Sequence, residues 1–550
     1  MLAGSLGFGV PSFAAAPSLK SVFPAGGQRG GTVEILLDGK AEKGKVWIEG
    51  GGVTFTAPDD KGKVQATLAA DATPGLRLLR VFNAEGVSEA VRFVVGTVPE
   101  VVEMQPNHAP LQAMPLDKLP VCVNGRIDKA GDIDHFSFLL KKGQQVRIDL
   151  LAYTLGSPID PLLHVLDEKG TRVATASDGR NLDPALSFTA PAEGRYTVQI
   201  AGFAHPPASE VSFTGGSSVV YRLTVHQGPL TTGVFPAAVS SKTSTRLTRR
   251  GIGLAKDQPL HEMPATELTA QGRLMQMAVP DCLLPLDGLV TPASPSTEAE
   301  PNDTPDKATS AASLPAVFGG RIHQRSDMDR FVFPVRKGQK LRAEIFAHRL
   351  GLPLDATLQA FDEGGKNLGV SEDQKDLADP ALNWTAAADG LHQVVVADQF
   401  HRGGEANEYV LEVAEVTPSF EATLADGKPL KVATGKKIEL KVNVKLLDDW
   451  KEPLVVRLSG LPKPSLISKA EIPVPAKGGD VTFAIEPMAE FPAGTHPFSL
   501  VVCKPDGKEA RLATYDLRGE NRRGSSQSDR DETLWLTVTS TFVGPPSPGQ

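Results

Sequence analysis

Cysteine, aromatic residues and long apolar runs are all scarce in this sequence. Its 550 residues include three cysteines, Cys122, Cys282 and Cys503, and only 6% of the residues are aromatic. The cysteines lie far apart and match no zinc or redox spacing, so we expect them to be buried small side chains without a disulfide. No run of about 18 apolar residues is present, which excludes a membrane-spanning helix.

Catalytic signatures are missing as well. The sequence holds no Gly-x-Ser-x-Gly elbow, no His-Glu-x-x-His pair and no phosphate-binding glycine loop. The dipeptide His261-Glu262 is followed by Met263-Pro264, which starts no zinc helix. The net charge of −8 is spread along the chain, which argues against nucleic acid as a partner because phosphate binding needs clustered Lys and Arg. We therefore expect no catalytic domain.

Strand-like alternation dominates what is present. Residues 32–37, 145–150 and 438–444 alternate apolar and polar side chains, which is the period of a strand with one buried face. Turn signals such as Asp38-Gly39 and Glu193-Gly194 separate these runs. Many short strands without long helical periodicity predict an all-β chain of tandem β-sandwiches.

Two motifs occur twice. The stretch 125–138 returns at 320–333, with Gly-Arg-Ile and then Asp-x-Asp-x-Phe-x-Phe in both copies, and a Lys-Gly-Gln follows each. A shorter motif, Val-Phe-Pro-Ala, occurs at 22–25 and 234–237. Repeats of this kind indicate successive structural modules. Because neither copy carries an obvious catalytic set, the repeat favours binding or assembly.

Acidic residues gather ahead of the second long copy and within it. Acids at alternate positions of an extended segment point to one side, and five carboxylates with an amide would repel one another unless a cation lay among them. Calcium takes about six to eight oxygen ligands of these kinds. A solvated acidic linker, with Asp residues capping a turn, is the alternative. The residues are Glu298, Glu300, Asn302, Asp303, Asp327 and Asp329.

The combined motif resembles the bacterial pre-peptidase C-terminal (PPC) domain, over about 98–226 and 298–414. It joins Gly-x-Ile, Asp-x-Asp-x-Phe and Lys-Gly-Gln, with Glu-x-Glu-Pro-Asn-Asp ahead of the second copy. The resemblance implies jelly-roll β-sandwiches, which this family appends to secreted proteases and which are related to the collagen-binding domains of clostridial collagenases. In calcium-binding members the leader and the Asp pair hold the ion, which implies calcium at the six residues above.

The first copy departs from that pattern. Its leader positions hold Glu103, Gln105, Asn107 and His108, so one carboxylate has become an amide and another an imidazole. Calcium affinity follows the number of charged ligands, so we expect little calcium binding there. His108 is interpreted as a surface residue rather than as a metal ligand.

The opening and C-terminal segments resemble the immunoglobulin-like modules of exported bacterial proteins. The order of modules is similar to that of large secreted proteins from planctomycete-type bacteria. The predicted division is a signal-peptide remnant at 1–16, an immunoglobulin-like sandwich at 17–97, a PPC-like sandwich at 98–226, a degenerate immunoglobulin-like segment and linker at 227–297, a second PPC-like sandwich at 298–414, a C-terminal immunoglobulin-like sandwich at 415–541 and a disordered tail at 542–550.

Export is indicated by the N-terminus. Residues 2–10 are small and apolar, and Ala14-Ala15-Ala16 precedes Pro17, as at the end of a secretory signal. No basic residue precedes the apolar run, so either the true start lies upstream or this is only an apolar tail. We expect a secreted, periplasmic or cell-surface protein.

Aromatic platforms would support sugar or collagen binding. Trp47, Trp384 and Trp535 lie in strand-like stretches and are expected to be core or half-buried, whereas Trp450 follows two Asp residues and is expected at the surface. With five tyrosines in all, collagen is a poor candidate.

The function expected from the sequence is non-catalytic binding or scaffolding outside the cell. The ligand would be a polysaccharide or a protein, with a structural calcium in the second PPC-like copy. The first alternative is an accessory component of a secreted peptidase system, which would require a partner chain or a lost domain, because no protease domain is recognised in this sequence. The second is an enzyme with an unrecognised site.

Overall fold

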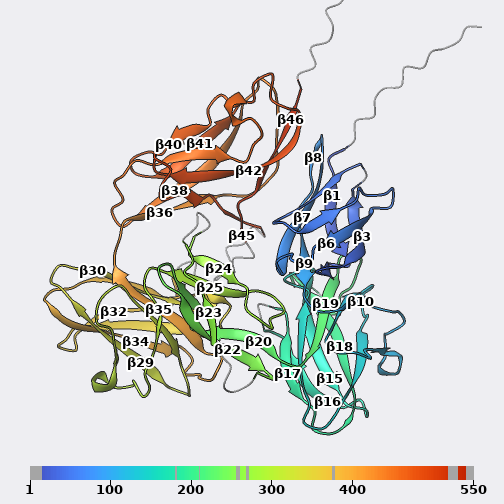
Figure 1. Ribbon diagram of the computed structural model, residues 1–550, viewed down its shortest axis with the longest axis horizontal. Coiled ribbons are helices and arrows are strands. Elements are labelled where there is room, and N and C mark those ends of the chain that lie inside the picture. The colour runs from blue at the N-terminus through green and yellow to red at the C-terminus, as the bar shows by residue number, and fades with distance from the viewer. Residues whose placement is uncertain are drawn as a thin grey trace, which may run out of the picture.

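The computed structural model describes residues 15–41, 43–179, 182–207, 209, 211–254, 260–267, 272–374, 378–517 and 530–540. Most of the predicted signal remnant and all of the predicted tail at 542–550 lie outside these residues. Within the described ranges the only helical elements are four short 3-10 turns, and none is long enough to cross a membrane. The strands form five successive groups, here called modules 1 to 5, and the prediction of an all-β chain of tandem sandwiches is confirmed (Figure 1).

Modules 1 and 3 share one plan. The first strand of each module pairs antiparallel with a neighbour in one sheet, and the second strand lies in the other sheet, where it pairs in parallel with the last strand of the module. In module 1 one sheet has β1 (Ser18–Phe23), β3 (Thr32–Lys40), β6 (Lys63–Leu68) and β5 (Val53–Phe55), and the other has β2 (Gly26–Gln28), β9 (Val91–Gly96), β7 (Gly75–Asn83) and β4 (Lys45–Ile48), with β8 (Gly86–Val87) beside β7. In module 3 the sheets are β20 (Leu230–Phe235), β22 (Thr245–Ile252) and β23 (Leu260–Met263), and β21 (Ala238–Ser240), β25 (Leu286–Thr291) and β24 (Leu274–Met277). Module 3 is a reduced sandwich, which accounts for its weak alternation.

Modules 2 and 4 have identical strand orders in both five-stranded sheets. Module 2 has β10 (Glu100–Val102), β12 (Val121–Arg126), β19 (Val220–Gln227), β14 (Gln145–Leu151) and β17 (Ala185–Thr189) facing β11 (Met114–Pro115), β13 (Asp134–Leu140), β18 (Gly194–Ala204), β15 (Ile159–Leu166) and β16 (Arg172–Ala176), with the turn η1 (Pro110–Gln112). Module 4 has β26 (Ser296–Thr297), β28 (Ala316–Arg321), β35 (Glu408–Glu415), β30 (Lys340–Phe346) and β33 (Ala381–Thr385) facing β27 (Thr309–Ser310), β29 (Met328–Val335), β34 (Gly390–Asp398), β31 (Ala356–Phe361) and β32 (Asn367–Ser371), with turns η2 (Pro305–Lys307) and η3 (His348–Leu350).

Module 5 completes the chain with a three-stranded sheet against a larger one. The smaller sheet has β36 (Ser419–Leu424), β38 (Ile438–Leu447) and β41 (Gly479–Ile485). The larger has β37 (Leu430–Ala433), β46 (Leu534–Thr539), β42 (Gly494–Cys503), β39 (Val455–Ser459) and β40 (Glu471–Pro473), with β43 (Arg511–Leu512) on β42, and β44 (Tyr515–Asp516) pairs with β45 (Arg530–Asp531). The turn η4 (Pro464–Leu466) follows β39.

Each module has its own core because the strands alternate as the sequence predicts. In β6, Val64, Ala66 and Leu68 are buried while the residues between them are exposed. The largest module cores, in modules 2, 4 and 5, consist of apolar residues from both facing sheets. This is the inward and outward alternation of a packed sandwich.

The junction between modules 1 and 2 is repeated between modules 3 and 4. The Arg126 guanidinium lies 5.1 Å from the Phe23 ring centre, and the Arg321 guanidinium lies 5.3 Å from that of Phe235. Both arginines belong to the repeated Gly-Arg-Ile, and both phenylalanines to the repeated Val-Phe-Pro-Ala. The repeating unit of the chain is therefore a pair of modules joined in a fixed way.

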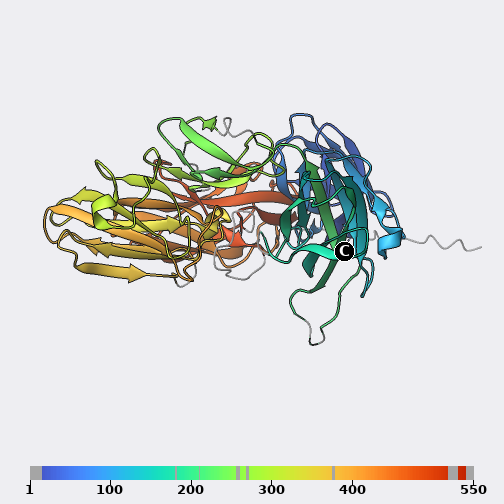
Figure 2. The same cartoon turned by 90° about the horizontal axis from the view of Figure 1, so that it is seen from below.

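The modules do not extend as a string, because module 5 packs against module 1 (Figures 1 and 2). The Trp535 ring lies 5.4 Å from the Trp47 ring and 5.5 Å from the Phe82 ring, measured between centres. Beside them, Arg80 of module 1 donates to the Tyr515 hydroxyl at 3.3 Å and lies 3.6 Å from Asp531. These contacts close the five modules into a ring.

One expectation about the aromatic residues is wrong. Trp450 is only 7% exposed, because Asp448 and Asp449 form a left-handed turn that returns its ring to the core against Phe420. Its indole N–H donates to the backbone oxygen of Glu452 at 2.7 Å. The three cysteines are free, as expected, although Cys282 is only partly buried.

Candidate metal centre

The acidic leader of module 4 lies along the mouth of its sandwich. The short strand β26 pairs in parallel with β28, and the Glu298 amide donates to the Gly319 oxygen at 3.0 Å, which extends this pairing. The loop from β28 to β29 then brings Asp327 and Asp329 to the same end of the sandwich. Segments that are distant in the sequence are thus held together by backbone hydrogen bonds.

The structure brings all the predicted carboxylates of module 4 into one cluster. Oxygens of Glu300, Asp327 and Asp329 lie within 4.8 Å of one another. Glu298 faces Asp329, and Asp303 faces Asp327, closely enough for the carboxyls to share hydrogen bonds.

The backbone around the cluster fixes several of these carboxylates. The Arg321 amide donates to Glu298 Oε1 at 2.7 Å, and the His323 amide donates to Asp327 Oδ2 at 2.6 Å. Asp327 is 5% exposed and Asp329 is 0% exposed, whereas Glu300 of the leader is exposed.

A tyrosine orients the innermost carboxylate, and the repeated glycine makes room for it. The Tyr409 hydroxyl donates to Asp329 Oδ2 at 2.5 Å. Tyr409 pairs with Gly320 across β28 and β35, and a Cβ on Gly320 would come within 2.3 Å of the tyrosine ring. The glycine of the Gly-Arg-Ile motif therefore serves the site, since any side chain there would displace this hydroxyl.

Three buried oxygens of the cluster have no hydrogen-bond donor while the carboxyls are ionised. They are Glu298 Oε2, Asn302 Oδ1 and Asp329 Oδ1, and Asn302 as a residue is 0% exposed. A buried polar atom without a partner is costly, so such atoms point to a missing ligand. The six predicted ligands offer oxygen atoms, most of them from carboxylates, and these are the donors that calcium prefers.

Without a cation the buried carboxyls resist ionisation. Burial raises the pKa of Glu298 to about 7, with the carboxylates of Glu300 and Asp327 adding to the effect. The pKa of Asp329 is raised to about 10, first by burial and then by the charge of Glu298. Burial also raises the pKa of Asp327. A divalent cation would replace the protons that these groups otherwise keep.

The sequence analysis missed one member of the cluster, His323. Its Nδ1 lies 3.2 Å from Glu300 and 3.8 Å from Glu298, and ligand atoms of these three residues lie within 4.8 Å of one another. His323 could have been found from the sequence because it directly follows the repeated Gly-Arg-Ile motif, in the segment that leads to Asp327. Only acidic and amide residues were considered there, so the histidine was overlooked.

The corresponding residues of module 2 also meet. His108 Nδ1 lies 2.7 Å from Asp132 Oδ1, and the Tyr221 hydroxyl donates to Asp134 Oδ2 at 2.7 Å and to Glu103 Oε2 at 3.1 Å. The His108 side chain is 41% exposed, in keeping with its interpretation as a surface residue, but it is also hydrogen-bonded within the cluster.

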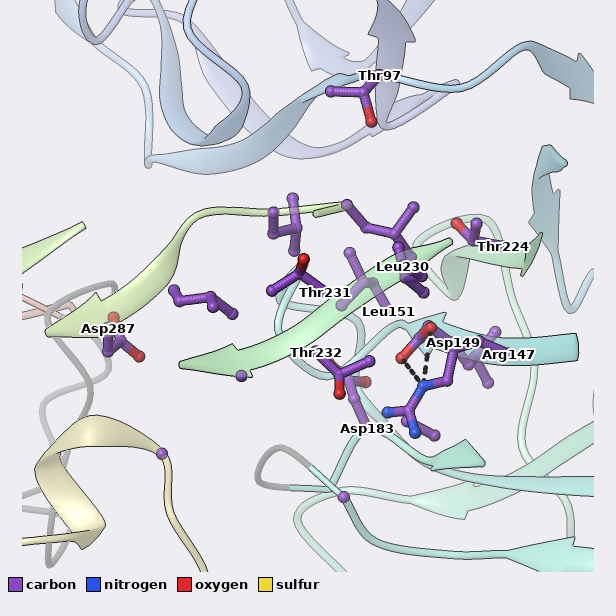
Figure 3. A pocket seen from close by; sticks show the side chains of 18 of the residues that line it. Thr97, Arg147, Asp149, Leu151, Asp183, Thr224, Leu230, Thr231, Thr232 and Asp287 are labelled. Atoms are coloured by element: carbon purple, nitrogen blue, oxygen red, sulfur yellow. Dashed lines mark hydrogen bonds and ion pairs between the residues drawn. The ribbon is translucent and has the colours of Figure 1, made fainter. Parts of the chain in front are cut away.

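A cavity of about 390 Å³ lies where modules 1, 2, 3 and 4 meet (Figure 3). Its polar groups are already paired: Arg147 Nε donates to both oxygens of Asp149 at 3.0 and 3.2 Å, and the Asp183 carboxylate accepts the backbone N–H groups of residues 152–154. The other labelled side chains are mainly leucine and threonine, and none of the described lining residues is aromatic. The cavity therefore offers no flat ring on which a sugar could stack.

The tyrosines and tryptophans are turned away from the surface. All five tyrosines are buried, Trp384, Trp450 and Trp535 are buried, and Trp47 is half-buried against module 5. No exposed tyrosine or tryptophan is thus available among the described residues as a binding platform.

Comparison with known proteins identifies one module. A family model described as the bacterial pre-peptidase C-terminal domain matches residues 132–202. A probable subtilase-type serine protease of Deinococcus radiodurans is 32% identical over 74 residues, which are 13% of this chain and 10% of that protein. The chain therefore spans about a tenth of the length of this curated relative.

Solved structures show only distant likeness. The pre-peptidase C-terminal domain of a collagenase from Bacillus anthracis aligns at 12% identity over 20% of this chain and 98% of that domain, with a TM-score of 0.16. The protein SGBP-B of the Bacteroides ovatus mixed-linkage glucan utilization locus, in complex with a mixed-linkage heptasaccharide, aligns at 11% identity over 73% of this chain and 74% of that one, with a TM-score of 0.15.

The chain is a tandem β-sandwich protein. Its residues 132–202, in module 2, match the model of the bacterial pre-peptidase C-terminal domain, and the resemblance inferred from the repeated motif is confirmed there. Module 4 has the same order of strands in both sheets as module 2.

Proposed function

We propose that this chain is an extracellular, non-catalytic binding and accessory protein whose module 4 holds a structural calcium ion. The observation that carries the calcium site is the set of buried, unpartnered oxygens in Glu298, Asn302 and Asp329. With Glu300, Asp303 and Asp327 they supply enough oxygen ligands for calcium, whose affinity in extracellular modules is about 10⁻⁴–10⁻³ M.

The role of the ion would be to fix the leader. Glu298, Glu300, Asn302 and Asp303 lie on the segment that leads from module 3 into the sandwich of module 4, whereas Asp327 belongs to the sandwich itself. An ion bound by both sets of residues would fix this segment against the sandwich, and so fix the position at which the chain enters module 4. Its function is mechanical, and none of these residues needs to act on a substrate.

The partner that the surface favours is a protein. Polysaccharide recognition commonly uses exposed aromatic rings, and the described tyrosines and tryptophans are turned inward. The family match and the protease relative support a role as an accessory to an exported peptidase. Export itself is part of the proposal, and PPC-like modules in secreted proteins support it.

The calcium site can be tested by thermal unfolding of the full chain under two conditions. One contains calcium at about 5–10 times the expected Kd of about 10⁻³ M, and the other contains EDTA. Calcium should stabilise the wild type by about 1 kcal/mol, from the ratio of free ion to Kd, and Asp327→Asn should remove the response. The matched control is Asp132→Asn, the same change in module 2, which should leave the calcium response intact. A wild-type midpoint that is equal in calcium and EDTA would show that module 4 has no such site.

The peptidase role can be tested separately. Immobilised full chain should retain an exported peptidase from culture supernatant of its source, and should not retain insoluble polysaccharides. Retention of a polysaccharide and of no protein would assign the other partner class.

A further inference from the structure

Module 2 keeps the architecture of the module 4 site but changes its donor atoms. Both sites lie between the leader and the loop that precedes the Asp-x-Asp strand, and both place a tyrosine hydroxyl on the second Asp. The corresponding pairs are Glu103 and Glu298, Gln105 and Glu300, Asn107 and Asn302, His108 and Asp303, Asp132 and Asp327, and Asp134 and Asp329.

Three ligand atoms of module 2 converge. One atom each of His108, Asp132 and Asp134 lies within 4.8 Å of the other two. The amides of Asp128 and Ile133 donate to Asp132 at 3.2 and 3.0 Å, so its carboxylate is held in place. Asp134 accepts the Tyr221 hydroxyl through Oδ2, and its Oδ1 has no hydrogen-bond donor while the Asp134 and Glu103 carboxyls are ionised.

Two buried oxygens of module 2 lack a hydrogen-bond donor. Asp134 Oδ1 and Asn107 Oδ1 have no hydrogen-bond partner, and both residues are 0% exposed. The Asn107 amide nitrogen donates to Glu103 at 3.4 Å, and Glu103 and Asp134 share the Tyr221 hydroxyl, so the asparagine belongs to the same cluster. Unpartnered oxygens beside an imidazole and a second carboxylate are suited to a cation rather than to an anion.

We propose that module 2 binds a divalent transition-metal ion, with Zn²⁺ as its representative, through His108, Asp132 and Asp134. Imidazole nitrogen suits zinc and its neighbours in the first row, whereas calcium is bound by oxygen. The neutral Gln105 in place of Glu300 removes a charge that calcium would use. Three protein ligands and an open, solvent-facing position are a common zinc arrangement.

The geometry requires only a small adjustment. At metal–ligand bonds of about 2.0–2.2 Å, tetrahedral ligand atoms lie roughly 3.4 Å apart. His108 Nδ1 and Asp132 Oδ1, now 2.7 Å apart, would separate by about 0.7 Å. The partly exposed His108 ring can make this movement.

The experiment uses the full chain without a histidine tag, stripped with EDTA and then titrated with Zn²⁺ by calorimetry. His323→Ala is included in every protein, because that histidine lies among the carboxylates of module 4. The background protein should bind one Zn²⁺, and His108→Ala should weaken this by about 100-fold or more, since even the loss of a group behind a ligand costs about 10–100-fold. Co²⁺ in place of Zn²⁺ should give a visible absorption band that His108→Ala abolishes.

A conversion variant separates a metal site from a simple hydrogen bond. Gln105→Glu with His108→Asp gives module 2 the donors of module 4, so zinc affinity should fall and calcium affinity should rise. The proposal is overturned if the background protein binds no Zn²⁺, or if His108→Ala binds Zn²⁺ with unchanged affinity. His108 is largely at the surface, so its replacement should not unfold the module, and circular dichroism verifies this.

Discussion

Replacing Trp535 by alanine should open the ring between modules 1 and 5. On β46 the side chains of Leu534, Leu536 and Val538 belong to the module 5 core, whereas Trp535 lies between them on the opposite face. Trp535 is nevertheless 0% exposed, because Trp47 and Phe82 of module 1 cover it. The indole therefore contributes to the contact between modules more than to the core of its own module.

The size of the effect follows from the burial. A tryptophan side chain buries about 200 Å², which at about 25 cal/mol per Å² is worth about 5 kcal/mol. Measured truncations of Trp to Ala cost about 3–5 kcal/mol. A loss of about 4 kcal/mol lowers the ratio of closed to open molecules by about 1,000-fold. Arg80, Tyr515 and Asp531 remain and retain part of the contact.

Single-molecule energy transfer can measure this ratio. Dyes would be attached at Lys61→Cys and Lys477→Cys, both exposed positions, with the partly buried Cys282 replaced by alanine. Trp535→Ala should add a population with lower transfer efficiency and increase the radius of gyration in X-ray scattering.

The matched control is Leu536→Ala, a change on the same strand that faces the module 5 core. It should destabilise module 5 by about 2–5 kcal/mol and leave the ring closed under native conditions. If Trp535→Ala left both the transfer efficiency and the unfolding free energy unchanged, the contact would not hold the modules together.

Two further predictions concern buried charge. In EDTA the chain should lose stability as the pH rises. The pKa of Glu298 is raised to about 7 and that of Asp329 to about 10, so the folded state holds more protons than the unfolded state. The free energy of unfolding is therefore highest below about pH 4 and falls as the pH rises through both pKa values. Glu298 alone accounts for about 3 kcal/mol, and urea midpoints at pH 5 and pH 9 should show a smaller difference in Asp329→Asn. Separately, Arg222→Met should lower the free energy of unfolding by about 3–5 kcal/mol. The substitution leaves the buried Glu100 carboxylate, now 2.6 and 2.8 Å from the guanidinium, without its charged partner. Recovery of the denaturation midpoint in Arg222→Met with Glu100→Met would support this, and an unchanged midpoint in the single variant would contradict it.

Local patterns were enough to predict the fold class and the first outline of the site. Alternation in segments such as 63–68 depends only on neighbouring residues, and the two copies of the long motif mark corresponding sandwiches. The carboxylates of module 4 could be grouped because the leader and the Asp-x-Asp strand recur at fixed places in the motif. Their burial, and the unpartnered oxygens, depend on the packing of the leader and could not be read from the sequence.

Contacts between modules were beyond the reach of that reasoning. Trp47 and Trp535 look like core residues in their own strands, and alternation does not say which outward face another module will cover. Trp450 was misplaced because a polar turn precedes it, although the turn directs the ring inward. His323 escaped notice since its role depends on which loop faces the acidic leader.

The repeated junction of modules means that this molecule carries its own reference. Modules 1 with 2 and 3 with 4 preserve the same Phe–Arg contact, whereas module 2 has Gln105 and His108 where module 4 has Glu300 and Asp303. A single sample therefore holds two versions of one site at the same pH, ionic strength and temperature. Differences between them in metal occupancy can be assigned to a few atoms, without the uncertainties of comparing two separate preparations.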